Sequence, residues 1–320
     1  MDPLLQVRVA AKRPVADGIA AFELAPLAGE RLPVFEAGAH IDVHVPDGPV
    51  RQYSLYDLPD DPQRYRIGVL RDPQSRGGSA KLLDAVQEGD VISVSAPRNH
   101  FALERDARHS ILFAGGIGIT PILSMAQQLA REQRSFDLHY CGRSLSRMAF
   151  VEPLRRSGFA AQVHVHVDDG AASQQLQARR SIGRPAPGTH LYVCGPTGFM
   201  AHVLETARAL GWDDAHLHRE YFAAAPVDHS ADGPFELALA RSGAVVRVGA
   251  DQSAAQALLD AGVGLSLSCE QGVCGTCMTR VMDGVPDHRD LYLTDAEHAR
   301  NDCFMPCCSR SRTPRLVLDL

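Results

Sequence analysis

The chain has 320 residues, of which 22% are charged and 45% hydrophobic, and its formal net charge at pH 7 is −6. This length suggests two or three domains with cores of their own. The negative charge argues against nucleic acid as the main partner, because such partners select basic surfaces. The sequence has no apolar run long enough for a membrane span and no signal-peptide pattern at its N-terminus. We therefore expect a cytoplasmic protein, in a compartment where disulfides are rare.

The first 105 residues have the pattern of an antiparallel β-barrel or sandwich. Alternating or apolar runs predict strands at 39–45, 51–56, 64–70 and 89–97. Glycine and proline separate these runs at short intervals, which is typical of all-β domains.

From residue 106 the pattern changes to alternating strands and helices. A buried strand is predicted at 109–116, and three more strands are predicted at 136–142, 161–167 and 189–195. Thr120 is positioned to cap a helix that has Pro121 at its first position, and a second helix is predicted near 197–210. This alternation predicts an α/β domain with a parallel sheet over residues 106–224.

A small, polar segment with proline and glycine, residues 225–234, is predicted to be a linker. After it, two alternating runs around Ser242-Gly243 predict a hairpin. Ser253 and Gln256 have the spacing of a capping box, so a helix is expected to begin there.

Three cysteines lie close together in a glycine-containing loop. Cys269, Cys274 and Cys277 have the spacing C-x4-C-x2-C, and six of the eight cysteines follow residue 268. Plant-type [2Fe–2S] ferredoxins use this spacing and a distant fourth cysteine. Structural zinc sites prefer two C-x2-C pairs, so a zinc or thiol scaffold is the weaker alternative. Cys303, Cys307 and Cys308 are the candidates for the fourth ligand.

Four further short motifs are weak signals alone and gain weight from their order along the chain. "RQYS" (51–54) is followed by "RGGS" (76–79), where successive glycines can offer backbone N–H groups to a phosphate. "GGIGITP" (115–121) and "YVCGP" (192–196) are glycine turns that follow predicted strands. Dinucleotides bind at the carboxyl ends of strands in open α/β sheets.

The order of these parts resembles the phthalate dioxygenase reductase family, which includes the vanillate O-demethylase reductases. "CEQGVCGTC", "DHRD", "CSR" and the closing "LVLDL" support the resemblance over nearly the whole chain. It implies three domains: an FMN-binding antiparallel β-barrel (1–105), an NAD(P)-binding α/β domain (106–224) and, after the linker, a β-grasp [2Fe–2S] ferredoxin domain (235–320). FMN is expected because only 22 residues separate Ser54 from Gly77, which leaves no room for an adenine-binding loop.

The resemblance also implies site residues. Arg51 and the 77–79 turn would bind the flavin phosphate. The cofactor-binding residues as a set are Arg51, Tyr53, Ser54, Ile67, Gly68, Val69, Gly77, Gly78, Ser79, Phe222, Gly116, Thr120, Cys194, Gly195 and Pro196. The catalytic residues would be Ser54, Cys194 and Glu220. The cluster ligands would be Cys269, Cys274, Cys277 and Cys307. If the segment with Cys307 is an extended strand, alternation directs Cys308 into the core, and Cys303 lies short of the site.

The implied activity is electron transfer from a two-electron donor to a one-electron acceptor. Hydride passes from NADH to FMN, and single electrons pass through the cluster to a Rieske non-haem iron oxygenase acting on an aromatic acid. A diiron hydroxylase or a cytochrome P450 is the alternative acceptor. NADPH is the alternative donor, because Arg143 and Ser144 follow a predicted strand where a 2′-phosphate could bind.

Overall fold

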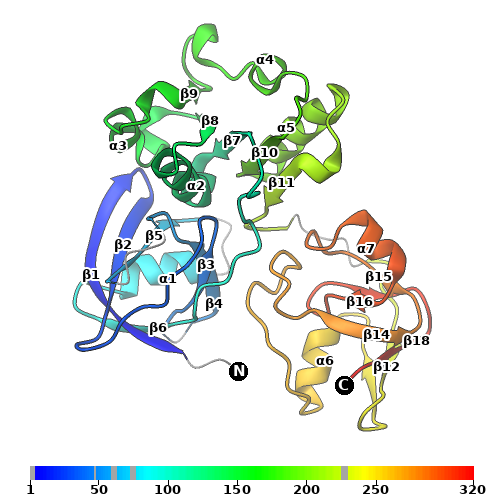
Figure 1. Cartoon of the computed structure of the whole chain (residues 1–320). Helices are drawn as coiled ribbons and strands as arrows, with labels where there is room; N and C mark the ends of the chain where they lie inside the picture. The colour runs from blue at the N-terminus through cyan, green and yellow to red at the C-terminus, as the bar shows by residue number, and fades with distance from the viewer. Residues whose placement is uncertain (1–3, 47, 59–62, 73–76, 225–229) are drawn as a thin grey trace. The chain divides into compact units, whose positions relative to one another are not determined.

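The computed structural model divides into two compact units, with the break between Phe222 and Ala223 (Figure 1). The residues that it describes are 4–46, 48–58, 63–72, 77–224 and 230–320. Arg76 of the predicted phosphate turn and residues 225–229 of the predicted linker lie outside these ranges. Within them, no helix is long and apolar enough to cross a membrane.

The first unit begins with a six-stranded antiparallel sheet in the order β4-β3-β6-β1-β2-β5. Its strands are β1 (Leu5–Ala16), β2 (Ile19–Pro26), β3 (His40–His44), β4 (Val50–Ser54), β5 (Tyr65–Leu70) and β6 (Val91–Val94). A bridge between Leu55 and Ile67 brings the two edges of the sheet together, so the sheet curls into a partly closed barrel. Alternating apolar side chains fill its interior, as at Ile41 and Val43, both 0% exposed.

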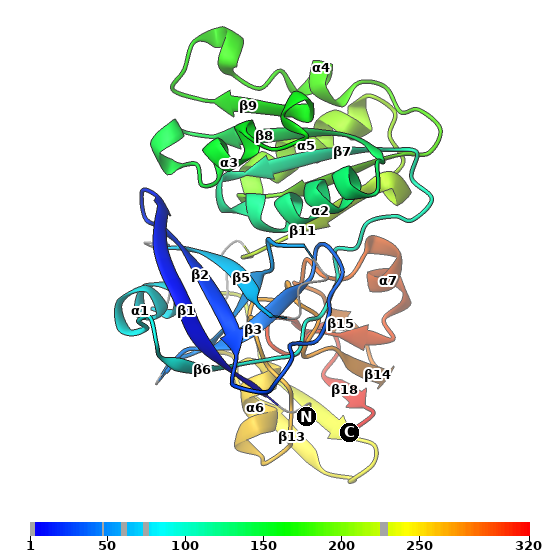
Figure 2. The same ribbon diagram turned by 60° about the vertical axis from the view of Figure 1, so that its left-hand side comes forward.

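The same unit continues with a five-stranded parallel sheet in the order β11-β10-β7-β8-β9 (Figure 2). Its strands are β7 (His109–Gly115), β8 (Ser135–Gly142), β9 (Val163–Val167), β10 (Thr189–Cys194) and β11 (Leu217–Glu220). The helices are α1 (Gly78–Ala85) beside the barrel and α2 (Ile119–Arg131), α3 (Val151–Arg155), α4 (Ala178–Ile182) and α5 (Thr197–Ala209) around the parallel sheet. Leu112 packs with α2 and Phe113 with α5, so the two helices cover opposite faces of the sheet.

The second unit contains a five-stranded mixed sheet in the order β13-β12-β18-β14-β16, with a separate pair β15-β17. Its elements are β12 (Phe235–Leu239), β13 (Val245–Val248), α6 (Ala254–Asp260), β14 (Thr279–Asp283), β15 (Pro286–Asp287), α7 (Asp295–Arg300), β16 (Cys303–Phe304), β17 (Arg310–Ser311) and β18 (Arg315–Leu318). The last strand, β18, lies between β12 and β14 in the middle of this sheet.

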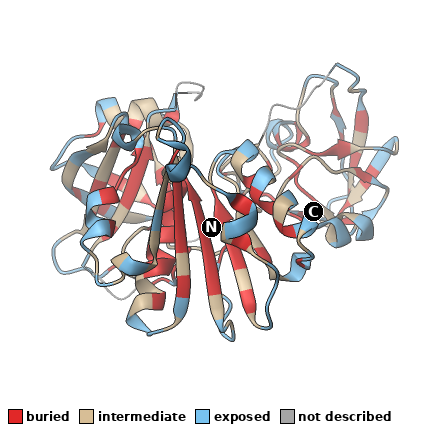
Figure 3. Ribbon diagram, turned by 90° about the horizontal axis from the view of Figure 1, so that it is seen from above, coloured by how far each residue is buried: buried red, intermediate tan, exposed pale blue. Residues whose placement is uncertain are grey.

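These sheets confirm the predicted fold class, an antiparallel barrel followed by a parallel α/β sheet and a C-terminal α+β unit. Buried residues concentrate in the strands, as Figure 3 shows. The predicted hairpin around Ser242-Gly243 is confirmed by the pairing of Ala238 with Val245. The predicted cap at Ser253 is confirmed as well, since its hydroxyl accepts a hydrogen bond from the Gln256 N–H at 3.1 Å.

The predicted cap at Thr120 is wrong. A short 3₁₀ turn, Gly116–Gly118, leads directly into α2, so Thr120 lies inside the helix. Its hydroxyl donates back to the carbonyl oxygen of Ile117 at 3.0 Å, which is what a threonine within a helical turn does. The sequence analysis also overlooked the first hairpin, β1–β2, although Asp17-Gly18 is a strong turn signal.

Candidate flavin, nucleotide and iron–sulfur sites

The predicted phosphate site brings β4 and the beginning of α1 together. A Cβ atom on Gly78 would lie 2.8 Å from both Cγ and Nε of Arg51, so the arginine stem passes directly over this glycine. The Ser79 hydroxyl lies near the same turn and accepts a hydrogen bond from the Asp72 N–H at 3.2 Å. A guanidinium beside the first turn of a helix is a suitable environment for a phosphate.

The two residues after Arg51 on β4 have different environments. Tyr53 pairs with Ile41 on β3, and burial raises the pKa of its hydroxyl above the usual range, although Arg51 opposes this shift. Ser54 pairs with His40 and is 4% exposed. Both residues therefore stay neutral at physiological pH and can act as hydrogen-bonding groups toward a flavin.

Strand β5 presents its backbone to the parallel sheet. Ile67 and Val69 are 0% exposed and belong to the barrel core, so Gly68 between them faces the other way. A Cβ atom on Gly68 would lie 2.8 Å from Cγ2 of Thr120 and 3.3 Å from Cδ1 of Ile117. The predicted flavin-lining and nicotinamide-contacting segments thus meet at one place in the first unit.

The two glycine turns of the parallel sheet touch through their backbones. A Cβ atom on Gly118 would overlap the carbonyl oxygen of Cys194, and one on Gly195 would lie 2.8 Å from Cα of Gly115. Nothing would lie within 4 Å of such an atom on Gly116, so this side of the turn is open. Pro196 precedes α5 directly. The carboxyl ends of β7 and β10 therefore meet at one edge of the sheet, which is open beside Gly116. Dinucleotides bind at such edges in open α/β sheets.

The three predicted catalytic residues come together at the end of this edge. Cys194 and Glu220 are paired in register on β10 and β11, and the Ser54 hydroxyl donates to Oε2 of Glu220 at 3.4 Å. Burial raises the pKa of Glu220 to about 8, and the hydrogen bond from Ser54 lowers it in part. The Cys194 thiol is 0% exposed, and its burial raises its pKa well above the usual value. Phe222 follows two residues after Glu220 and is 40% exposed, so its ring is accessible to a flavin.

The structure adds one residue that the sequence analysis overlooked. Nδ1 of His40 lies 3.9 Å from Oε1 of Glu220, and the two side chains are 5% and 14% exposed. His40 occupies an alternating strand and carries no local motif, so its partner could be found only after the fold was known. The predicted site therefore contains a buried histidine in addition to the predicted carboxyl and hydroxyl.

In the second unit, four cysteine side chains gather around the cysteine loop. Contacts with the Cys274 and Cys307 thiols lower the pKa of Cys269, and Cys307 lowers that of Cys277. The N–H of Gln271 donates to the Cys269 sulfur at 3.4 Å, and the N–H of Thr276 donates to the Cys274 sulfur at 3.5 Å. Thiolate-type ligands surrounded by backbone N–H donors are the environment that a [2Fe–2S] cluster requires, so these residues fit the cluster.

Two glycines of this loop are needed for its path. Gly272 and Gly275 both have φ +71°, a left-handed conformation that favours glycine. Any side chain on Gly272 would overlap the Cys308 sulfur, and any side chain on Gly275 would overlap the ring of Tyr292. The loop is therefore held in its wrapped conformation by steric limits as well as by hydrogen bonds.

The segment that carries the candidate fourth ligand is a turn. Pro306–Cys308 are not extended, and the N–H of Cys308 donates to the carbonyl oxygen of Met305 at 3.1 Å. The expectation that strand alternation separates Cys307 from Cys308 is therefore wrong for this segment. The assignment of Cys307 as the ligand rests instead on its contacts with Cys269 and Cys277. Cys308 is half-buried, close to Gly272, and does not point fully into the core as expected.

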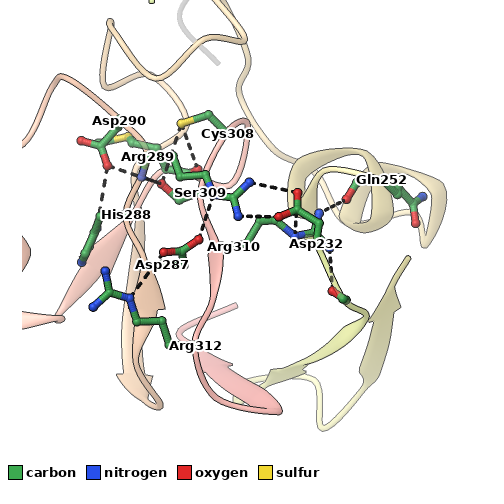
Figure 4. Close-up of polar contacts among 12 residues, drawn as sticks. Asp232, Gln252, Asp287, His288, Arg289, Asp290, Cys308, Ser309, Arg310 and Arg312 are labelled. Atoms are coloured by element: carbon green, nitrogen blue, oxygen red, sulfur yellow. Dashed lines mark hydrogen bonds and ion pairs between the residues drawn. The ribbon is translucent and has the colours of Figure 1, made fainter. Parts of the chain in front are cut away.

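A buried ionic network joins the segment before β12 to the segments around β15 and β17 (Figure 4). Arg289 Nη1 donates to Oδ2 of Asp232 at 2.9 Å, and Arg310 Nε lies 3.5 Å from the same carboxylate. Arg310 is 5% exposed, and it also donates to the carbonyl oxygens of Gln252 and Gly249 at 2.7 and 2.8 Å. Since each charge has a partner, the network fixes the start of the second unit without leaving an isolated buried ion.

Two family profiles match parts of the chain. The 2Fe-2S iron-sulfur cluster binding domain matches residues 237–312. The N-terminal domain of dimethylamine monooxygenase subunit DmmA-like proteins matches residues 92–217.

Characterised proteins match the whole chain. The vanillate O-demethylase oxidoreductase of Pseudomonas sp. strain HR199 is 53% identical over 317 residues, covering 99% of this chain and 100% of that protein. Phthalate dioxygenase reductase of Burkholderia cepacia is 40% identical and covers 100% of this chain and 98% of that protein.

Solved structures agree with these relatives. A structure of phthalate dioxygenase reductase, described as modular for electron transfer from pyridine nucleotides to [2Fe-2S], has a TM-score of 0.77 and 40% identity, with 100% of this chain and 98% of that chain covered. An intact type IV self-sufficient cytochrome P450 monooxygenase has a TM-score of 0.88 and 37% identity. In that case 99% of this chain is covered, but only 41% of the longer protein. The chain therefore belongs to the family of the vanillate O-demethylase oxidoreductases and phthalate dioxygenase reductases, and it is an electron-transfer oxidoreductase with flavin, pyridine-nucleotide and [2Fe–2S] modules.

Proposed function

We propose that this protein takes a hydride from NADH onto FMN and delivers the electrons singly, through a [2Fe–2S] cluster, to a Rieske-type oxygenase that acts on an aromatic acid. The observation that carries the proposal is the coexistence of two sites in one chain: Ser54 and Glu220 beside the glycine turns, and the four-cysteine loop. A flavin exchanges two electrons with a nicotinamide and one at a time with an iron–sulfur cluster, so it connects the two kinds of carrier.

The side chains of the first unit have separate tasks in this proposal. Arg51 and the two glycines at the start of α1, Gly77 and Gly78, bind the phosphate of FMN, and the exposed ring of Phe222 covers the flavin. The close backbone contact between Gly118 and Cys194 leaves a narrow edge for the nicotinamide half of NADH. Ser54 and Glu220 supply a hydroxyl and a carboxyl next to the reacting atoms, in a site with little water.

The first experiment identifies the cofactors and the donor. Acid extraction of the purified protein should release FMN, and the visible spectrum should add [2Fe–2S] absorption to the flavin bands. Finding FAD as the main flavin would overturn the FMN assignment. Comparing kcat/KM for NADH and NADPH decides the donor, and a preference for NADPH would direct attention to the exposed Arg143 after β8.

The second experiment identifies the acceptor. Purified Rieske oxygenases for vanillate and for phthalate should each be reduced by this protein and NADH, with substrate-dependent product formation in at least one case. Their choice follows from the names of the relatives. Reduction of neither oxygenase, with intact flavin and cluster, would refute the Rieske assignment.

A cytochrome P450 is the second candidate acceptor. The reason is the structural likeness over 99% of this chain to part of a self-sufficient P450 monooxygenase. If this protein reduces a P450 haem to its carbon monoxide complex faster than it reduces the Rieske oxygenases, the P450 assignment replaces the first one.

A further inference from the structure

Two histidines and one aspartate of the second unit lie close together between β15 and α7. His288 and Asp290 follow β15, and His298 lies on α7. Each of the three side chains offers one atom that can bind a metal ion, and these atoms all lie within 4.8 Å of one another. None of the three belongs to the flavin, nucleotide or cluster sites, so the grouping has no explanation in the proposed electron transfer.

The Asp290 carboxylate lies at the centre of this group, and its side chain is 0% exposed. Its Oδ2 accepts hydrogen bonds from the Leu293 N–H at 2.9 Å and from Nε2 of His298 at 3.2 Å. The Ser309 hydroxyl donates to Oδ1 at 3.4 Å, and Nδ1 of His288 lies 3.7 Å from the same oxygen (Figure 4). Among the described residues, no arginine or lysine forms an ion pair with this carboxylate.

A buried carboxylate needs a positive partner, because burying an unpaired charge is costly. The two histidines are the groups that can provide this charge. They can do so in two ways, either by taking up a proton or by holding a cation between themselves and the carboxylate.

His288 favours the second way. Its side chain is 9% exposed, and neither ring nitrogen forms a hydrogen bond of normal geometry among the described residues. Burial and the neighbouring His298 ring lower the pKa of His288, although Asp290 and Asn301 oppose this shift. The ring is therefore neutral at physiological pH. A neutral imidazole with an unpartnered nitrogen is unusual in a protein interior, and it is the form that binds a metal ion.

The spacing of the ligand atoms is close to that of a zinc site. Two ligands at about 2.0–2.1 Å from a tetrahedral zinc ion lie about 3.3 Å from each other. The distance from Nε2 of His298 to Asp290 is 3.2 Å, and that from Nδ1 of His288 is 3.7 Å. The two rings are stacked with their centroids 4.4 Å apart, so a bound ion would draw them slightly apart at one edge. The His298 side chain is 25% exposed, which gives an ion access from solvent.

A similar group in the first unit shows what a solvated arrangement looks like. Nε2 of His109 and Nε2 of His164 lie 3.4 and 3.2 Å from the two oxygens of Asp137. These three side chains are 28%, 44% and 43% exposed, so water can solvate each of them. Asp290 has no such access to water, and this difference distinguishes the buried group from the surface one.

We propose that His288, Asp290 and His298 form a binding site for one divalent first-row metal ion, with Zn²⁺ as the ion that fits best. Two imidazoles and one carboxylate suit Zn²⁺, Fe²⁺ or Ni²⁺, whereas Mg²⁺ and Ca²⁺ prefer ligand sets of oxygen atoms. Water completes the coordination on the side where His298 is exposed. On binding, Nε2 of His298 releases its proton to solvent, and the ion replaces that proton beside the carboxylate.

The site also lies against the cysteine loop. A Cβ atom on Gly272 would lie 2.9 Å from Cβ of Asp290, and the Leu291 N–H donates to the carbonyl oxygen of Gly272 at 3.0 Å. An ion at this site joins α7 to the segment on which the loop packs. We therefore expect the ion to stabilise the loop against unfolding.

The first experiment measures zinc binding to the holoenzyme. Protein purified without added metal is dialysed against graded concentrations of Zn²⁺ at neutral pH, and bound zinc is counted by mass spectrometry. His298→Gln and His288→Gln should each weaken binding by about 10- to 100-fold or more, because loss of a group that merely orients a ligand already has such an effect. His164→Gln is the matched control from the solvated group and should bind zinc as the unaltered protein does.

A second readout identifies the ligands in the unaltered protein. X-ray absorption at the zinc edge is not disturbed by the iron of the cluster. It should show nitrogen and oxygen ligands at about 2.0–2.1 Å with imidazole scattering and no sulfur. Zinc should also raise the temperature at which the cluster absorbance is lost in the unaltered protein, but not in His298→Gln. The flavin and cluster spectra of each variant before heating check that it has folded.

The outcomes decide the proposal without reference to NADH oxidation. Equal zinc affinity in His288→Gln, in His298→Gln and in the unaltered protein would overturn it. A sulfur shell at about 2.3 Å would assign the zinc to cysteines and would overturn it as well. Weakening in His164→Gln as large as in His298→Gln would place the ion in the first unit instead. A protein that binds zinc as expected but is not reduced by NADH would retain this site and lose the proposed function.

Discussion

The two redox sites of this chain are built in opposite ways. The cysteine loop contains three of the four proposed cluster ligands within nine consecutive residues, Cys269 to Cys277, and its glycines are fixed by contacts next to it. The proposed hydride site combines Ser54 from the barrel, Cys194 and Glu220 from two strands of the parallel sheet, and His40 from a further strand. Substitution of one ligand should abolish a site that is built from a single loop. A site that is assembled from several strands should instead be sensitive to changes around each of its residues.

The largest effect should follow the loss of a ligand in the local site. We predict that Cys307→Ser abolishes or strongly weakens the [2Fe–2S] signal in visible and electron paramagnetic resonance spectra, because a cluster needs four thiolates. FMN binding and its reduction by NADH should survive. Cys308→Ser and Cys303→Ser are the matched controls and should keep the cluster. Loss of the signal in Cys308→Ser alone would assign the ligand to that residue instead.

The second largest effect should follow a change of the Glu220 carboxyl in the proposed hydride site. Glu220→Gln should lower the rate of acceptor reduction by about 10²-fold, since glutamine cannot exchange a proton. The cluster signal should stay unchanged. Glu205→Gln, an exposed carboxyl on α5, is the control. A variant with normal turnover would show that the carboxyl has no role in the reaction.

Glu220→Gln should also raise the free energy of unfolding of the first unit at alkaline pH. The pKa of Glu220 is about 8 when folded and near 4.5 when unfolded, so its contribution to stability is complete below pH 4.5 and is lost as pH rises toward 8. Glutamine removes this penalty, which we expect to be about 4 kcal/mol at pH 8. Urea unfolding followed by flavin fluorescence at pH 5 and pH 8 tests this, and an equal gain at both values would contradict it.

A smaller effect concerns the stability of the first unit in acid. Burial lowers the pKa of His139 to about 3 and that of His218 to about 4. Both rings are neutral in the folded state. Their contribution to the free energy of unfolding is therefore complete above pH 6.5, and it is lost as pH falls toward the pKa values of the folded state. The first unit should therefore lose stability between pH 6.5 and 5. In His139→Asn this acid sensitivity should be reduced, while in His202→Gln, which changes an exposed residue on α5, it should persist.

The smallest effect concerns a helix cap in the second unit. Ser253→Ala should lower the free energy of unfolding by about 1 kcal/mol, since the hydroxyl caps the N–H of Gln256. Gln256→Ala should cost less, because the glutamine side chain bonds to Asp260 rather than back to the cap. Thermal unfolding followed by cluster absorbance measures both, and a larger loss in Gln256→Ala would contradict the cap.

What the sequence could predict follows the same division between local and assembled features. The spacing of three cysteines and the cap at Ser253 depend on residues close in the chain, and both were predicted. The cap at Thr120 was predicted wrongly, because the 3₁₀ turn before α2 has no clear sequence signal. His40 was overlooked, because its relation to Glu220 depends on how the barrel meets the parallel sheet. The turn at Pro306–Cys308 was missed because the segment was taken as extended.

The position of β18 has a consequence for biosynthesis. This strand lies between β12 and β14, so the sheet of the second unit has a gap at its centre until the ribosome has made Arg315–Leu318. The barrel and the parallel sheet have all their strands long before that moment, and N-terminal domains generally fold first during synthesis. The cysteine loop therefore emerges from the ribosome before the sheet that supports it is complete. Iron should then be inserted late, into a chain whose first unit is already folded.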